Sequence, residues 1–212
     1  MESGTFRAQS SPHITQQGLG LIEVLITLFI LSIGLLGVAS LQLVGSFTNS
    51  AALNRSDATM QVQQLSERLQ ASALQSLSAP GRIVDNQYFA ADNWNFAGLA
   101  CDESNPWQCH CTARPVAIPD CEANQCSSAE MARYDGWQVS CAAVKSNPSA
   151  QLAMTCADIN ALDGQSCSAG STLQIILRWP TTSWQGANRI DNPDCAIDGS
   201  ENADCVVVRL IL

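Results

Sequence analysis

The chain has 212 residues, of which 46% are hydrophobic and 14% are charged, so its size suits one compact domain or a domain with an anchor. This composition excludes a disordered acidic tail and a coiled-coil rod. The net charge of −9 is unevenly placed, because residues 1–84 carry equal numbers of acids and bases and residues 85–212 carry the whole excess of acids. An acidic domain repels phosphate backbones, so no nucleic-acid partner is expected.

An uncharged segment runs from Val24 to Asn54, and residues 24–44 within it are mostly aliphatic residues, Phe, Ala and Gly. It is long enough to cross a bilayer as a helix. One carboxylate, that of Glu23, directly precedes the segment. A carboxylate is costly in lipid, so Glu23 is expected to have a partner or a function.

Three interpretations of this segment compete. A secretory signal peptide would use residues 25–36 as its apolar region and be cut after Ala39, which releases a soluble protein beginning at Ser40. A plain membrane anchor explains neither Gly18 nor Glu23. A prepilin leader would be cut before the apolar run, so that the whole helix stays in the mature protein.

Residues 18–25, with the sequence GLGLIEVL, resemble the class III signal of type IV pilins and pseudopilins. In that signal the cut follows the Gly, and an acidic residue is fifth in the mature chain. The resemblance implies cleavage between Gly18 and Leu19, N-methylation of Leu19 and a role for Glu23 in subunit assembly. The prepilin peptidase would carry out both modifications, so this protein would be its substrate and not an enzyme.

Residues 21–42 and 58–71 look like the type IV pilus modification protein PilV family of minor pilins, and the similarity covers about residues 17–72. It implies a type IV pilus subunit, placed in a priming or tip complex for pilus assembly, with roles in adhesion or twitching motility. The implied partners are other minor pilins, the major pilin, the inner-membrane assembly platform and a tip adhesin. The implied location is the inner membrane, single-pass with a periplasmic head, followed by the extracellular pilus.

Two rival functions remain. A minor pseudopilin of a type II secretion system would carry the same signal and helix. The secreted disulfide-rich binding protein cut after Ala39 is the rival from another class.

The resemblance implies that residues 1–18 are a leader. No proline lies between Pro12 and Pro80, so residues 19–80 are predicted to form one long helix. Residues 19–44 would form its membrane or fibre-core part, and residues 45–80 its amphipathic part. In the amphipathic part, apolar residues at helical spacing predict one stripe that packs on the protein's own sheet, with a partner-binding groove as the alternative. The stripe consists of Ala58, Val62, Leu65, Leu69, Ala73 and Leu77.

By the same resemblance, the Glu23 carboxylate would pair with the terminal ammonium group of Leu19 in a neighbouring subunit. Such a buried pair fixes axial register more than it adds net stability. The alternative is that Glu23 contacts only the peptidase or lipid headgroups. Gly34 and Gly37 weaken the helix by about 1 kcal/mol each relative to Ala, and serve either local unwinding or close helix packing.

Residues 85–212 are predicted to form a Cys-rich globular β head. Three segments have the composition of strands, residues 137–144, 173–179 and 205–212. Together with the resemblance to pilins, these segments imply an α+β, type IV pilin-like fold class, with a long N-terminal helix whose second half packs on an antiparallel sheet.

All ten cysteines lie between Cys101 and Cys205, which is typical of an exported, oxidised domain. Composition and spacing do not give the pairing. Cys195 and Cys205 resemble the disulfide-closed C-terminal loop of pilins and are the first candidate bond. Cys156 and Cys167 are the next most local pair.

Metal and catalytic sites have little support. Cys109, His110 and Cys111 are suitable zinc ligands, but their spacing fits no standard zinc knuckle, and disulfides are favoured in an oxidising compartment. An acidic stretch follows residue 190 and is interpreted as a solvated loop, with a calcium site as the alternative. It has five acids, of which the candidate calcium ligands are Asp194, Asp198, Glu201 and Asp204. No catalytic residue, metal or cofactor is expected, since no nucleophile motif or phosphate loop occurs.

Overall fold

The computed structural model describes residues 20–77, 79–101, 105–180, 193–195 and 203–211. The chain divides into two compact units, residues 1–49 and residues 50–212. We call residues 50–212 the head. Helix α1 contributes residues to both units. The helices are α1 (Leu21–Ser72), α2 (Pro106–His110) and α3 (Ser128–Ser146), with 3-10 turns η1 (Asn86–Phe89), η2 (Ala91–Asn93) and η3 (Pro193–Cys195). The strands are β1 (Leu74–Gln75), β2 (Arg82–Ile83), β3 (Gln151–Ala157), β4 (Thr172–Pro180) and β5 (Ala203–Ile211).

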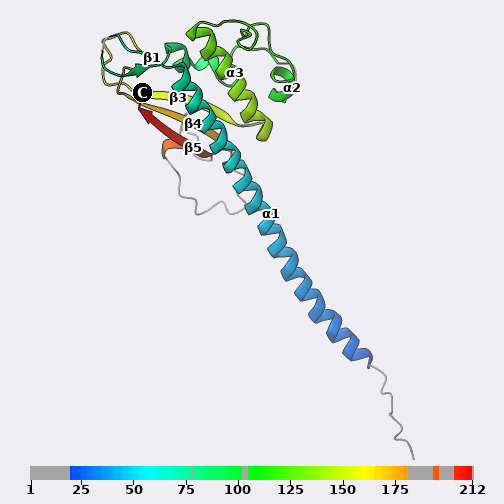
Figure 1. Cartoon of the computed structure of the whole chain (residues 1–212). Coiled ribbons are helices and arrows are strands. Elements are labelled where there is room, and N and C mark those ends of the chain that lie inside the picture. Colours follow the sequence, from blue (N-terminus) through cyan, green and yellow to red (C-terminus); the bar gives the residue numbers. More distant parts are fainter. Residues whose placement is uncertain (1–19, 78, 102–104, 181–192, 196–202, 212) are drawn as a thin grey trace, which may run out of the picture. The chain divides into compact units, whose positions relative to one another are not determined.

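The head is built on a three-stranded antiparallel sheet in the order β3-β4-β5, and a separate two-stranded hairpin is formed by β1 and β2. Two of the predicted strands lie in this sheet as β4 and β5. The last strand pairs with β4 along its whole length, from Ala203 opposite Pro180 to Ile211 opposite Thr172. A long helix followed by antiparallel sheets confirms the predicted α+β class and is consistent with a pilin-like fold (Figure 1).

The prediction that the long helix runs to residue 80 is wrong, because α1 ends at Ser72. The chain turns back at once as the β1-β2 hairpin, in which Leu74 lies opposite Ile83. Gly81 supports the turn with a φ of 130°, a backbone conformation that side chains disfavour. The Arg82 guanidinium donates a hydrogen bond of 2.7 Å to the Ala73 carbonyl and so satisfies a carbonyl group at the end of the helix.

The predicted strand at residues 137–144 is also wrong, because these residues lie inside α3. The helix begins with a complete capping box. The Ser127 hydroxyl accepts from the Glu130 backbone, and the Glu130 carboxylate accepts from the Ser127 backbone at 2.8 Å. This start signal precedes an alanine-rich segment without proline, and it outweighs the short alternation of apolar and polar residues.

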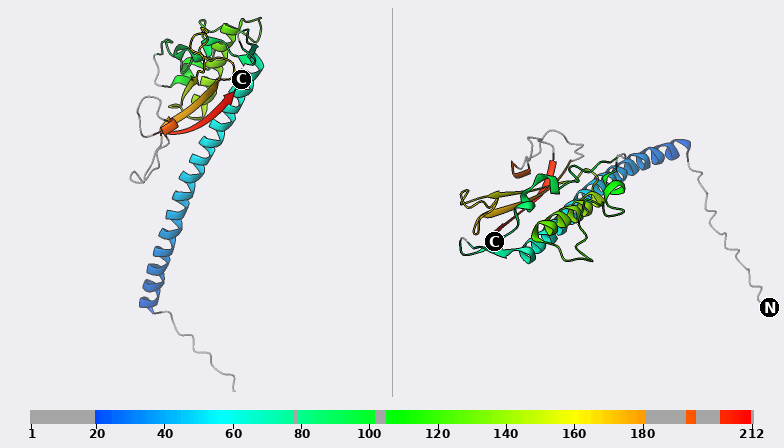
Figure 2. Two further views of the ribbon diagram at one scale, coloured as in Figure 1. Left: turned by 90° about the vertical axis from the view of Figure 1, so that its left-hand side faces the viewer. Right: turned by 90° about the horizontal axis from the view of Figure 1, so that it is seen from above.

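Helices α1 and α3 lie side by side and antiparallel within the head (Figure 2). The Gln61 side chain donates to the Ala142 carbonyl at 3.0 Å, whereas Arg68, further along α1, reaches back to Asp135. Both helices share one buried core with one face of the sheet, which presents Leu152, Leu173, Ile175 and Leu177 among others. Ile176 and Cys205 belong to a smaller cluster on the other face.

Most of the predicted apolar stripe on α1 is in this core. Ala58, Val62, Leu65, Leu69 and Ala73 are buried, and they pack with the sheet of their own chain as predicted. Leu77 is fully exposed, because the helix ends before it and the chain has entered the hairpin.

Gly136 allows η2 to approach α3 closely. A Cβ at this position would lie 2.2 Å from the carbonyl oxygen of Asn93, which is a backbone atom and cannot rotate away. We expect Gly136→Ala to lower the free energy of unfolding by about 1–3 kcal/mol, because overpacking outweighs the better helix propensity of Ala.

Thermal unfolding of the full chain in detergent measures this effect. Gly45→Ala is the matched control, because no atom lies within 4 Å of a Cβ built at Gly45. An unchanged unfolding temperature for Gly136→Ala would show that η2 can move away from α3 at little cost.

Candidate functional site

The N-terminal segment contains the residues that are predicted to be cleaved, methylated or used in subunit assembly. Gly18 and Leu19, the predicted cleavage and N-methylation positions, lie outside the described residues. Glu23 lies in the first turn of α1, and its backbone N–H donates to the Gly20 carbonyl at 2.9 Å. A carboxylate at this end of a helix is favoured by the helix dipole.

The first unit exposes an apolar surface on all sides of α1. No residue of α1 up to Asn54 carries a charge after Glu23. The exposed large side chains include Leu25, Phe29, Leu36, Leu41 and Phe47. Water does not favour such a surface, so it requires a cover of lipid or protein.

Four hydroxyl groups on the described part of this unit are satisfied within the helix itself. Thr27, Ser32, Ser40 and Thr48 each donate to a backbone carbonyl one turn earlier, at 2.7–2.9 Å. A hydroxyl bonded in this way needs no water, which makes it compatible with an apolar surrounding. By length and composition, α1 can cross a membrane, since its most apolar window has a mean hydropathy of 2.6.

A comparison with known protein families gives a match, and it covers the start of α1. Residues 15–39 match the prokaryotic N-terminal methylation motif. This motif is the signal of type IV pilins and pseudopilins. It supports a prokaryotic pilin-like protein, processed by a prepilin peptidase, anchored in the inner membrane and assembled with other pilins. No curated protein and no solved structure matches the chain.

The ten cysteines of the head form five disulfides. The structure pairs Cys195 with Cys205 and Cys156 with Cys167, the two candidate bonds from the sequence. The other three bonds are Cys101–Cys109, Cys111–Cys141 and Cys121–Cys126. The bond from Cys111 to Cys141 attaches the Cys-rich loop to α3, and the remaining bonds close short loops.

The zinc alternative loses its ligands in this arrangement. Cys101, Cys109 and His110 place potential ligand atoms within 4.8 Å of one another, but both sulfurs belong to a disulfide and offer no thiolate. Cys111 is likewise bonded to Cys141. The His110 ring is buried, stacks on Phe96 with 4.8 Å between ring centroids, and has a pKa lowered by burial.

The acidic stretch near the C-terminus is only partly described. Asp198 and Glu201 lie outside the described residues. Asp194 forms an ion pair of 2.9 Å with Arg209, and Asp204 lies in β5 opposite Trp179.

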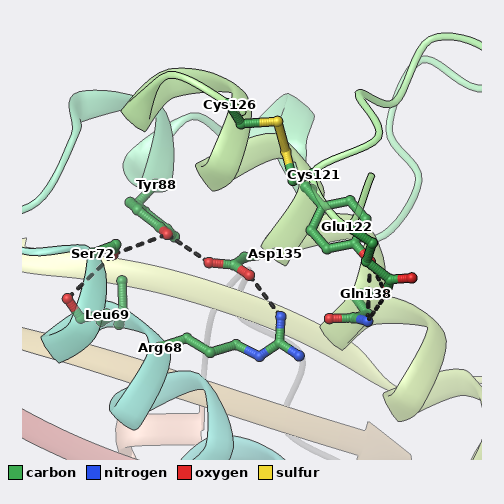
Figure 3. Close-up of polar contacts among 10 residues, drawn as sticks. Arg68, Leu69, Ser72, Tyr88, Cys121, Glu122, Cys126, Asp135 and Gln138 are labelled. Carbon is green, nitrogen blue, oxygen red and sulfur yellow. Dashed lines mark hydrogen bonds and ion pairs between the residues drawn. A yellow bond between two sulfur atoms is a disulfide. The ribbon is translucent and has the colours of Figure 1, made fainter. Parts of the chain in front are cut away.

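A buried polar cluster joins α1, η1 and α3, and we call it the Asp135 cluster (Figure 3). The Asp135 carboxylate is almost fully buried and binds Arg68 at 2.7 Å through one oxygen. Its other oxygen accepts from the Tyr88 hydroxyl at 2.6 Å. The Ser72 hydroxyl lies 3.1 Å from the Tyr88 hydroxyl. Both carboxylate oxygens are therefore satisfied, as a buried charge requires.

The Asp135 cluster escaped prediction from the sequence. The predicted strand at residues 137–144 gives no reason to expect Asp135 beside Arg68. The available signal was the capping box at Ser127 and Glu130, which places Asp135 inside a helix and close to Arg68 only once that helix is recognised. The Asp135 carboxylate links Arg68 of α1 and Tyr88 of η1 to α3, which is a structural role.

The two tyrosines of the chain provide a test of this burial. Burial and the Asp135 hydrogen bond raise the pKa of Tyr88 well above its ordinary value of 10.0. Burial and a hydrogen bond to Glu122 raise the pKa of Tyr134 to about 12. The folded state thus binds both protons more tightly than the unfolded chain, so this contribution to stability is fully present below pH 10 and is lost as the pH rises above it.

We expect the native protein to show almost no tyrosinate absorbance at 295 nm between pH 10 and 11, whereas the unfolded chain ionises there. Unfolding at higher pH should release both protons. Tyr134→Phe leaves Tyr88 as the sole signal. Ionisation of that variant near pH 10 in the folded state would contradict a Tyr88 buried against Asp135.

Disulfide mapping tests the pairing. Non-reduced proteolysis should give linked peptides for the five pairs and no alkylatable thiol, and reduction should add about 2 Da per bond. A peptide linking Cys109 to Cys111 or Cys121 would overturn the arrangement of the Cys-rich loop.

Proposed function

We propose that this protein is a minor pilin of the type IV pilus, similar to the PilV family, which enters the fibre in a priming or tip complex. The observation that carries the proposal is the methylation motif at the start of α1, followed by an apolar part of that helix whose side chains are exposed on every side and which has no charge between Val24 and Leu53. A disulfide-bonded head supports it, because disulfides persist outside the cytoplasm.

In this proposal the peptidase cuts after Gly18 and methylates Leu19. The apolar unit of α1 then moves from lipid into the fibre, where it contacts the other minor pilins and the major pilin. Glu23 pairs with the terminal amine of a neighbouring subunit, which offsets the burial of both charges and fixes the axial register. The head lies first in the periplasm and later on the surface of the pilus, where it serves assembly, twitching motility or adhesion beside a tip adhesin.

The role is structural, and no catalytic step is assigned to the chain. The Tyr88 hydroxyl donates to the Asp135 carboxylate, the Asp158 carboxylate accepts from the Ser168 backbone, and all ten cysteines are bonded in pairs. A minor pseudopilin of a type II secretion system is the second candidate, since the same motif supports it. Recovery in sheared surface fibres favours the pilin, and retention in the envelope with loss of protein secretion on deletion favours the pseudopilin.

The intact mass of the native protein tests the proposal directly. We expect a chain that begins at N-methylated Leu19 and is recovered from sheared surface fibres, with the membrane fraction as control. A chain that begins at Ser40 would instead indicate the secreted binding protein cut after Ala39. A chain that begins at Leu19 but is found only in membranes and not in fibres would contradict the proposal that the protein is a pilus subunit.

Glu23→Gln tests the assembly role of the carboxylate. The variant keeps the size of the side chain and removes its charge, so the neighbouring ammonium would lose its partner. We expect the amount in fibres to fall by roughly tenfold or more, which corresponds to about 1.4 kcal/mol or more. Cleavage and membrane insertion should be unchanged.

Glu67→Gln is the matched control, because it makes the same chemical change on an exposed position of the same helix. An uncleaved Glu23→Gln protein would show that Glu23 acts on the peptidase and not in assembly. Normal fibre levels of Glu23→Gln would also contradict the pairing.

A further inference from the structure

The head exposes several large apolar side chains, and they are unevenly distributed over its surface. Among its described residues they are Leu53, Met60, Leu74, Leu77, Val116, Ile159, Leu162 and Ile211. Single exposed apolar residues are normal on a protein surface, whereas a cluster marks an interaction site. Five of these side chains lie at one end of the head, and we call them the distal patch: Leu74, Leu77, Ile159, Leu162 and Ile211.

Strand register and hydrogen bonds bring the distal patch together. Thr172 pairs with Ala157 on one side and with Ile211 on the other, so the β3-β4 connection and the last residues of β5 lie at the same end of the sheet. The Asn86 side chain, just after the β1-β2 hairpin, bonds the backbone of Gly164 and Ser166 in that connection, at 3.1 and 2.7 Å. The patch therefore lies where α1 finishes, and α1 enters the head at the other end.

The β3-β4 connection holds its apolar side chains on a braced loop. The Cys156–Cys167 disulfide closes it. The Asp158 carboxylate accepts from the Ser168 backbone at 3.0 Å, and the Ile159 backbone donates to Ser171 at 3.0 Å. A braced loop loses little conformational entropy when it binds a partner.

Two other exposed apolar residues lie on α1, where it enters the head. Leu53 and Met60 are seven residues apart and therefore share one face of the helix. By helical spacing this face is opposite to the buried stripe that contains Val62 and Leu69. The chain thus carries an apolar helix face at one end of its head and an apolar patch at the other.

We propose that the distal patch binds the corresponding helix face of another pilin-type subunit, an inference that rests on the proposed function. A surface at one end that fits a different surface at the other makes a heterologous contact, which continues along a fibre and does not close into a dimer. An amphipathic helix laid on an apolar surface is a standard recognition mode. This protein is then covered at its distal end and is not the outermost subunit of the fibre.

Site-specific photo-crosslinking in the full-length protein tests this contact. A benzophenone amino acid is placed at Leu77 or Leu162 in the patch, or at Val116 as a control that is equally exposed but lies in the Cys-rich loop. We expect adducts from the two patch positions in fibres, joined to a peptide from the N-terminal helix of a protein with the methylation motif. Val116 should give none of these adducts.

A paired substitution measures the consequence. Leu77→Asp with Leu162→Asp should lower the fibre-associated amount on the order of tenfold, whereas Val116→Asp should leave it unchanged. Disulfide content and membrane levels should stay constant in both, since these side chains are outside the core.

The outcomes separate this inference from the proposed function. Wild-type protein absent from fibres overturns the pilin proposal itself. Wild-type protein present in fibres overturns only the docking inference if the patch positions give no adduct, crosslink to lipid or to a protein without the motif, or if the paired substitution incorporates normally.

Discussion

The stripe that α1 buries in the head is the contact on which the rest of the structure depends. Val62, Leu65 and Leu69 are completely buried between the sheet and α3, so the helix is a central part of the core. The Asp135 cluster then sets the position of α3 against α1, because a buried carboxylate tolerates only an arrangement in which both oxygens are bonded. Packing supplies the free energy, and the polar cluster supplies the specific geometry.

The sequence predicted those features that follow from long, uninterrupted patterns. The apolar run predicted α1, helical spacing predicted the buried stripe, and strongly β-branched segments predicted β4 and β5. The errors occurred where two short signals competed. Residues 137–144 alternate like a strand, but the capping box upstream decides for a helix, and β3, short and mixed in composition, gives no clear pattern. α1 ends at Ser72, before Pro80 and Gly81, because the chain turns back as the β1-β2 hairpin, in which Arg82 donates to the Ala73 carbonyl.

The candidate site also has parts that local sequence predicts and parts that only the structure reveals. The predicted cleavage and assembly residues, Gly18, Leu19 and Glu23, lie close together in the sequence, so a local motif is enough to propose them, and residues 15–39 match the prokaryotic N-terminal methylation motif. The two disulfides singled out beforehand, Cys156–Cys167 and Cys195–Cys205, join cysteines close in sequence. Cys111–Cys141 spans 30 residues and depends on the placement of α3, so it required the structure. The distal patch likewise draws its residues from three separate segments that only strand register brings together.

The apolar unit of α1 explains why a membrane protein can also be a fibre subunit. Lipid tails and packed aliphatic side chains are similarly apolar, so moving this surface from bilayer to fibre changes the hydrophobic free energy little. The direction and register of assembly must therefore come from other groups. Glu23 is the one charge at the start of that surface, and its burial is acceptable only beside a partner of opposite charge. The heads add the remaining selectivity, because contacts between their surfaces form in water, where covering apolar side chains such as Leu77 and Leu162 is favourable.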